Sequence, residues 1–411
     1  MTQPKAKLLR NLTLPQVALY GLGNILGAGI YVLIGEIAGI AGHLAPFAFL
    51  LAAAVAAFTA FTFAEFSARY PFSGGGALYI HKGFNKPTLT VVVGGLMVLT
   101  GIISAATIAR GFVGYLNIFI DTDYNLSIVV LVAGLCALAC WGIKQSVAVA
   151  VVITLAEVFG LLLIVWVAQT SDVVVTAALP ETEEPLSAVW TGLLGASFLA
   201  FYAYIGFEDI VNVAEETKNP ETTMPWAILI ALLVATALYA LATAAALAVL
   251  TPGELANSDA PLAAVFQRAT GSSPWFISLI SMFAVVNGAL IQIIMCSRIG
   301  FGLAQENLLP QWMGKTNART QTPINATLLV SALIAVAAIS LSTETLARFT
   351  TTILLVIFVL VNIALLKVKQ RCGAAVGIME VPRALPIIGA VASAAFLVAE
   401  AYSFITNLFS S

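Results

Sequence analysis

The residues whose types and spacing could do chemistry begin in an apolar stretch near the N-terminus. Residues 14–41 are long enough to cross a bilayer, yet Asn24 and four glycines fall between Gly21 and Gly29. Each glycine lowers helix stability by about 1 kcal/mol relative to alanine, so we expect the helix to open near Gly27. An opened helix presents bare N–H groups from one half and bare C=O groups from the other. Those groups suit a ligand that carries both a carboxylate and an ammonium group.

A second apolar segment, residues 188–216, is interrupted in a similar way. Gly206 lies in its middle and is closely followed by two acids, Glu208 and Asp209. The alternative for the first stretch is close helix packing, because its glycines also have the spacing of small-residue contacts between helices. The second interruption favours opened helices in both segments.

The composition restricts the class of protein. The chain has 411 residues, of which 60% are hydrophobic and only 9% are charged, whereas charged residues usually supply about 25% of a soluble protein. We therefore expect an all-α polytopic membrane protein. The net charge of −2 and the lack of a basic stretch argue against a nucleic-acid partner. The four cysteines form no CxxC pair and the two histidines are not clustered, so no metal site is expected.

Hydropathy predicts eleven membrane-spanning segments. They cover residues 14–41, 44–68, 88–118, 126–142, 147–169, 188–216, 225–250, 275–303, 324–341, 346–366 and 384–406. We expect a Gly-rich loop at 71–84, an acidic loop at 171–187 and a polar loop at 251–274 between them.

Lysine and arginine predict the orientation. With the N-terminus in the cytoplasm, all of the 18 Lys and Arg residues except Arg110, Arg268 and Arg348 fall on the cytoplasmic side. Positive charge collects in cytoplasmic loops, so this orientation in the cytoplasmic (inner) membrane is strongly favoured. An odd number of spans then places the C-terminus outside.

Four segments resemble the amino acid–polyamine–organocation (APC) transporter superfamily, in particular its cationic amino acid branch. GLGNILGAGIYVLIG is similar to the broken first helix of that family, and FYAYIGFEDIVNVAEETKNPETTMP to its sixth helix. FAEFSARYPFSGGGALYI resembles the second helix with the first inner loop, and SRIGFGLAQENLLPQWMGKTNARTQTP the end of the eighth helix.

The resemblance implies a leucine-transporter-like fold with a five-plus-five inverted repeat, in which helices 1 and 6 are broken. Residues 1–411 would form one transmembrane domain. Repeat one would cover about 14–169, repeat two about 188–366, and an extra helix about 384–406. Such a protein would move amino acids across the membrane by alternating access.

The resemblance also implies a substrate site at the two opened helices. Backbone N–H groups near Gly27 would meet the substrate carboxylate, and carbonyl groups of both breaks would meet its ammonium group. The implied substrate-binding residues are Asn24, Ile25, Gly27, Ala28, Gly29, Ala203, Tyr204, Gly206 and Phe207, and Ile103, Thr107 and Asn287 are candidates for lining the side-chain pocket. For Asn287 the alternative is a hydrogen bond between helices.

Glu157 is the sharpest candidate for coupling transport to an ion. An acid well inside a span is costly and functional by default. Proton-coupled relatives carry a lysine on the fifth helix where sodium sits in sodium-coupled ones, and an ungapped alignment from Lys144 places Glu157 there. Two mechanisms stay open. The carboxylate could bind a proton, or it could help to bind sodium together with backbone carbonyls and Ser297. The structural alternative is a hydrogen bond to a neighbouring helix.

Glu208, just past the second break, is a further candidate for coupling or for contact with substrate. Asp209 would face about 100° away on a helix and is assigned no such role. Glu65 and Arg69 are one helical turn apart and form a candidate structural or gating pair. Tyr31 and Tyr202 are candidate gates, for which simple packing is the alternative.

The leading hypothesis is an amino acid transporter that is coupled to protons or exchanges substrates, and sodium coupling is the alternative. We expect no enzymatic activity, because the chain has no HExxH or GxSxG motif and no histidine pair, and no nucleotide-driven pump, because it has no GxxxxGK[ST] motif. No cofactor is expected beyond the coupling ion, H+ or Na+. The partners would be an amino acid and the lipid bilayer.

Overall fold

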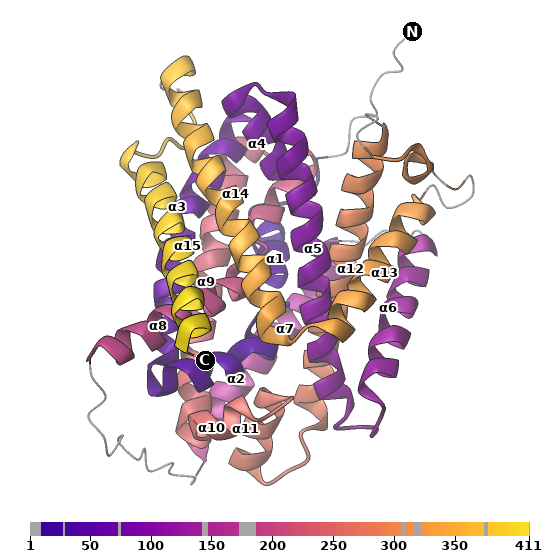
Figure 1. Ribbon diagram of the computed structural model, residues 1–411, viewed down its shortest axis with the longest axis vertical. Helices are drawn as coiled ribbons and strands as arrows, with labels where there is room; N and C mark the ends of the chain where they lie inside the picture. Colours follow the sequence, from indigo (N-terminus) through magenta and orange to yellow (C-terminus); the bar gives the residue numbers. More distant parts are fainter. Residues whose placement is uncertain are drawn as a thin grey trace.

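The computed structural model is a bundle of helices, and its described residues contain no sheet. It describes residues 10–27, 29–72, 75–141, 147–171, 186–305, 309–315, 317, 322–373 and 377–410. In Figure 1 most helices run along the long axis of the molecule. Short helix α4 (Gly75–Phe84) lies at one end, and α10 (Pro252–Ala256) and α11 (Pro261–Thr270) lie at the other. We call these the α4 end and the α10 end.

The long helices follow the predicted spans closely. They are α1 (Leu14–Leu26) and α2 (Gly29–Ala41), α3 (Ala45–Arg69), α5 (Pro87–Leu116), α6 (Tyr124–Trp141), α7 (Val147–Thr170), α8 (Leu186–Phe201), α9 (Pro220–Val249), α12 (Trp275–Gln305), α13 (Ile324–Ser340), α14 (Thr343–Cys372) and α15 (Ala384–Ser410). Short 3₁₀ segments are η1 (Gly42–Leu44), η2 (Tyr202–Tyr204), η3 (Phe207–Glu216) and η4 (Gln311–Gly314).

Length and composition support a membrane protein with many spans. Nine helical stretches of described residues are long and apolar enough to cross a bilayer, and one of them, Gly29–Arg69, runs through α2 and α3. α13 is apolar but slightly shorter, and the first predicted span is divided between α1 and α2. With these two included, each of the eleven predicted spans corresponds to a helix or a broken helix. The repeat boundaries stay a prediction.

Three predicted boundaries were wrong. The supposed loops 71–84 and 251–274 contain α4 and the α10–α11 pair. In α11 the helix is started by Pro261 and is ended by Gly271, at φ +68°. The helix α14 continues beyond residue 366 to Cys372, since Lys369 in this extension is buried and paired rather than solvated.

Helix α7 has an exposed face that is suited to contact with lipid. Leu155, Phe159, Leu162 and Trp166 recur at helical spacing and are all more than 45% exposed. Thr154, Glu157, Leu161 and Ile164 recur on the other face and are buried. The exposed face is therefore apolar and the buried face carries the polar groups, which is the reverse of a helix on a water-soluble protein.

A buried group of charges fastens the α4 end. The carboxylate of Glu65, in α3, accepts from Arg69 Nε at 2.7 Å and pairs with Lys369 Nζ, in α14, at 2.8 Å. It also accepts from the backbone N–H of Val381 at 2.8 Å. Glu380 adds a second carboxylate, 3.2 Å from Lys369 Nζ. The predicted Glu65–Arg69 pair is thus one part of a network that joins α3, α14 and the segment leading to α15.

We predict that Glu65→Gln destabilises the protein. Removing one partner of a buried pair leaves the other charges uncompensated, which costs about 3–5 kcal/mol of stability. The unfolding temperature in detergent should fall, and adding Lys369→Met should recover part of the loss. The control is Glu344→Gln, because the carboxylate of Glu344 pairs with Arg348 at 40% exposure and should contribute little. Equal unfolding temperatures for Glu65→Gln and wild type would contradict the stabilising role.

Candidate functional site

The two predicted helix breaks are present in the structure. α1 ends at Leu26 and α2 begins at Gly29, while Ala28, between them, lies outside the described residues. α8 ends at Phe201, and the chain turns at Gly206, whose φ of +119° is open to glycine. It then continues as the 3₁₀ segment η3. Both interruptions predicted from the glycines are therefore confirmed.

Missing side chains allow the two breaks to lie against each other. A Cβ atom on Gly29 would lie 2.2 Å from the Cα of Ala203. A Cβ atom on Gly206 would lie 2.6 Å from the carbonyl oxygen of Asn24. Neither distance is tolerable between real atoms, so glycine is required at both crossing points. Each break thus supplies one glycine on which the other packs.

Tyr239, on α9, joins the two breaks by hydrogen bonding. Its hydroxyl lies 2.7 Å from the carbonyl oxygen of Ile25 and 2.9 Å from that of Ala203. A tyrosine hydroxyl has one hydrogen to donate, whereas each carbonyl oxygen has two lone pairs. The hydroxyl can therefore satisfy one carbonyl at a time, and both carbonyls keep capacity to accept another donor.

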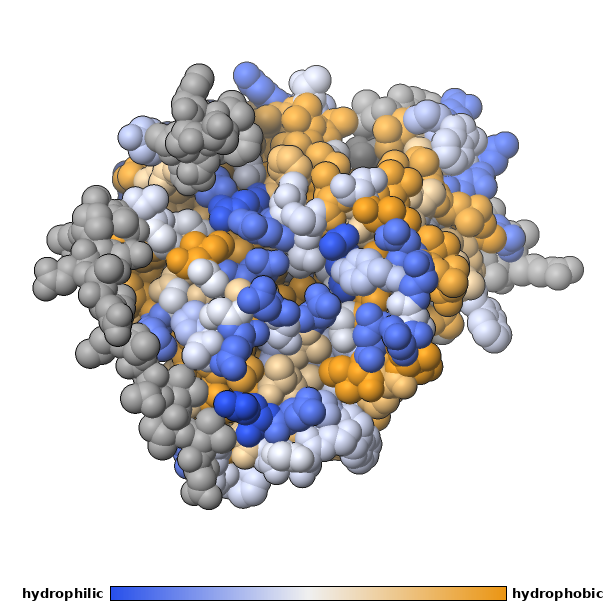
Figure 2. Space-filling model, turned by 60° about the horizontal axis from the view of Figure 1, so that its bottom comes forward, coloured by the Kyte–Doolittle hydropathy of each residue, from blue (hydrophilic) through white to orange (hydrophobic). Residues whose placement is uncertain are grey.

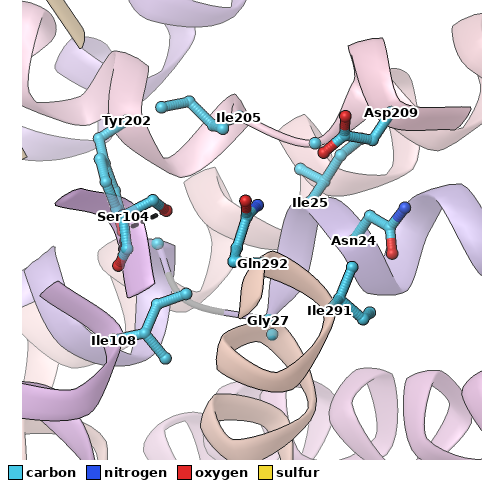
Figure 3. A pocket seen from close by; sticks show the side chains of 13 residues that line it. Asn24, Ile25, Gly27, Ser104, Ile108, Tyr202, Ile205, Asp209, Ile291 and Gln292 are labelled. Atoms are coloured by element: carbon cyan, nitrogen blue, oxygen red, sulfur yellow. Dashed lines mark hydrogen bonds between the residues drawn. The ribbon is translucent and has the colours of Figure 1, made fainter. Parts of the chain in front are cut away.

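A cavity lies where the breaks meet (Figure 3). It holds about 430 Å³ of space free of protein atoms, a volume that includes its opening. We call it the central cavity. Its lining includes the predicted residues Asn24, Ile25, Gly27, Gly29, Tyr202 and Gly206.

The rest of the lining of the central cavity comes from Ile205, at the second break, and from three further elements. Helix α5 contributes Ser104 and Ile108, helix α12 contributes Gly288, Ile291 and Gln292, and η3 contributes Asp209. Within α5 and within α12 the main contributors are four residues apart and so share one helix face. These residues and Ile205 were not predicted.

Two residues of the lining carry polar atoms without partners among the described residues. Asn24 Nδ2 and Gln292 Oε1 are buried and have no hydrogen-bond partner in the described part of the chain. In the view of Figure 3, the Gln292 side chain stands between Ser104 and Tyr202 on one side and Asn24 and Asp209 on the other. Buried polar groups left unpaired are costly, so a polar ligand that paired with these atoms would relieve that cost.

A second cavity continues from the central cavity towards the α4 end. The two share Ser104, Ile205, Asp209 and Gln292. The second one adds Glu208, whose carboxylate accepts from the backbone N–H of Gly206 at 2.9 Å. Glu208 therefore caps the start of η3 and also borders the space that leads away from the breaks.

Glu157 lies on the buried face of α7. It is 1% exposed, and both of its carboxylate oxygens lack a hydrogen-bond partner among the described residues. Tyr31 contacts the same residue, but its hydroxyl donates to the backbone carbonyl of Glu157, at 2.9 Å. One turn earlier, Thr154 fills the space left by Gly23 of α1, so Glu157 lies close to the first break. The structural alternative, a hydrogen bond between helices, is not seen for this carboxylate within the described part of the chain.

Other predicted residues lie outside the lining of the central cavity. Thr107 donates to the carbonyl of Ile103, and Phe207 packs edge-on against Phe63. The hydroxyl of Tyr204 donates to the carbonyl of Phe49. Asn287 and Ile103 are each adjacent in sequence to a residue that lines the cavity, but they are not part of the lining.

Ser297 is far from Glu157 along the bundle. Its hydroxyl donates to the carbonyl of Ile293, one turn back in α12, at 2.6 Å. Gly160 of α7 packs against Ile280 of α12, so the turn that contains Glu157 faces the part of α12 near residue 281. At 1.5 Å per residue, Ser297 is roughly 20 Å further along that helix. The structure does not bring these two predicted ion-site residues together.

Comparison with known proteins is consistent with this geometry. The sequence profile of the amino acid permease family matches residues 12–410. The chain is 29% identical over 400 residues to the mitochondrial cationic amino acid transporter 3 of Arabidopsis thaliana, covering 88% of this chain and 63% of that protein. It is 26% identical over 395 residues to the branched-chain amino acid permease BcaP of Bacillus subtilis, covering 90% of this chain and 83% of the permease.

A third relative, the chloroplastic cationic amino acid transporter 9 of Arabidopsis thaliana, is 31% identical over 331 residues, which cover 74% of this chain and 56% of that protein. The chain thus spans about three fifths of the length of the plant relatives that it matches. The profile match covers almost the entire chain and agrees with the resemblance seen in the four sequence segments. The chain belongs to the amino acid permease family, within the amino acid–polyamine–organocation superfamily.

Proposed function

We propose that this chain is a secondary transporter that moves amino acids across the cytoplasmic membrane by alternating access. The observation that carries this proposal is the pair of broken helices, which meet at a cavity whose lining includes Asn24 and Gln292, each with a polar atom unpaired among the described residues. The amino acid would lie in the central cavity, with its carboxylate near the N–H groups at the start of α2. Its ammonium group would lie near the carbonyls of Ile25 and Ala203, both of which can accept a further hydrogen bond.

Two features bear on which amino acid would bind. Asp209 and Glu208 border the connected cavities, whose described linings include no lysine or arginine, and this favours a cationic side chain. Ile25, Ile108 and Ile291 give the central cavity an apolar wall, which favours a neutral one. The relatives named above are a branched-chain permease and two cationic amino acid transporters, so lysine and leucine are the two substrates to test.

Glu157 is the proposed coupling group. Burying an ionised carboxylate that has no hydrogen-bond partner costs much more free energy than burying the neutral, protonated form. A proton is therefore the ligand that this site favours. Its position beside the first break would let protonation act on the helix that holds the substrate. The distance of Ser297 supports the proton over a sodium ion shared between these two residues. We propose proton-coupled symport, with exchange of amino acids as the alternative.

The first prediction is that a proton gradient drives uptake and that Glu157 is needed for it. Radiolabelled lysine and leucine would be offered to proteoliposomes with proton and sodium gradients imposed separately. Glu157→Gln should abolish accumulation driven by the proton gradient and should leave exchange with preloaded amino acid intact, because substrate binding does not need the carboxylate. Glu344→Gln is the matched control. Accumulation driven by sodium alone would overturn proton coupling, and dependence on preloaded amino acid alone would indicate an exchanger.

The second prediction concerns the crossing of the breaks. In Gly29→Ala, the new methyl group collides with the Cα of Ala203, so the breaks must separate and uptake should be lost. Gly95→Ala, in α5, is the control, because a Cβ there meets nothing within 4 Å. Normal uptake by protein carrying Gly29→Ala would show that the breaks do not need this contact.

The third prediction concerns Tyr239. Tyr239→Phe removes the one hydroxyl donor that the carbonyls of Ile25 and Ala203 share, at a cost of about 1–3 kcal/mol. We expect a lower unfolding temperature and slower uptake. Tyr115→Phe is the control, since the hydroxyl of Tyr115 makes a similar bond, of 2.7 Å, to the carbonyl of Tyr31 outside the breaks. If both variants slow uptake equally at matched stability, Tyr239 has no special role at the breaks.

A further inference from the structure

A third cavity, at the α10 end, is not used by the mechanism above. It holds about 460 Å³ of space free of protein atoms, including its opening. The orientation predicted from lysine and arginine places Arg110, in this cavity, and Arg268, in α11, outside the cell, so we call it the outer cavity. Its polar lining comprises Glu36, Arg110, Tyr124, Ser258, Asp259 and Thr343. Figure 2 shows hydrophilic residues gathered over this end of the molecule.

Arg110 is held rigidly in the wall of the outer cavity. Its Nε donates to Thr343 Oγ1 at 3.1 Å, and its Nη1 donates to the carbonyl of Ala338 at 2.7 Å. The guanidinium lies over the ring of Tyr124, 5.1 Å from the ring centre. These contacts fix the side chain and leave the Nη2 donors without a partner among the described residues. A guanidinium fixed in this way is prepared to bind a carboxylate.

Among the described residues, no carboxylate lies within ion-pair distance of Arg110. In the described part of the chain it forms no ion pair, and neither do Glu36 and Asp259. One cation and two carboxylates therefore line the same cavity but remain apart. A simple anion would meet the two carboxylates, and a simple cation would meet the arginine. A ligand with both charges, placed a few ångströms apart, satisfies all three groups.

The outer cavity lies directly beyond the central cavity. In α2, Gly29 lines the central cavity and Val32 lines the outer one. In α5, Ile108 lines the central cavity and Gly111 lines the outer one. Three residues of helix correspond to about 4.5 Å, so a ligand in the outer cavity would be less than its own length from the breaks.

We propose that the outer cavity is a second binding site for a zwitterionic α-amino acid, which it holds before transfer to the central cavity. Arg110 binds the carboxylate, and Glu36 and Asp259 bind the ammonium group. This inference rests on the proposed function, because it concerns the route by which the same substrate enters.

The test measures half-saturation of transport separately from each side. Intact cells expressing the protein report uptake of external radiolabelled lysine or leucine, whichever wild type transports better, and preloaded cells report efflux. Arg110→Gln should raise the external KM about tenfold, the loss expected for a charge-assisted hydrogen bond. Maximal uptake and the half-saturation of efflux should stay near wild type. Arg110→Lys, which keeps the charge, should recover part of the external affinity.

The control is Arg348→Gln. Arg348 is also at the α10 end, but it pairs with Glu344 at 2.8 Å and Glu400 at 2.6 Å and does not line the outer cavity. An unchanged external KM for Arg110→Gln, at normal surface expression, would overturn the second site. Equal losses of affinity from both sides would also overturn it, because they would indicate a structural role. If wild type moves no amino acid, the proposed function fails, and this inference fails with it.

Discussion

The contact between the two opened helices is the constraint on which the rest of the structure depends. Inside a membrane, an unsatisfied backbone group costs several kcal/mol, so a helix can open only where protein or a water-filled cavity covers the break. Here each break covers the other. Gly29 admits the backbone of Ala203, and Gly206 admits the carbonyl of Asn24. Tyr239 then supplies a donor to carbonyls of both breaks.

Buried polar groups elsewhere in the bundle contrast with those at its centre. Glu65 meets two cations and a backbone N–H group. Asn362 of α14 bonds Thr59 and Thr62 of α3. These groups join helices and are satisfied within the protein. Asn24 Nδ2, Gln292 Oε1 and both carboxylate oxygens of Glu157 are also buried atoms, yet they lack hydrogen-bond partners in the described structure. Such groups destabilise the empty protein, and a ligand or a proton would relieve the cost.

The residues that sequence reasoning missed have physical explanations. Asp209 was set aside because adjacent residues of an α-helix face about 100° apart. The segment is instead a 3₁₀ helix that begins at a left-handed glycine, and this geometry brings Asp209 to the central cavity and Glu208 to the neighbouring one. Ser104 and Gln292 could have been noticed as polar residues in apolar spans. Which face of α5 and α12 turns inward depends on packing between distant helices, and no local pattern predicts that.

The sequence by itself determined the membrane class, the number of spans, both breaks and the acid inside the fifth span. Those features follow from local chemistry: apolar length, the weak helix propensity of glycine and the cost of charge in lipid. Only the tertiary structure decided which groups meet. It paired Glu65 with Lys369, separated Ser297 from Glu157, and placed Arg110 in a cavity with Glu36 and Asp259. The reason is that such contacts join segments far apart in the chain, and their geometry depends on how whole helices pack.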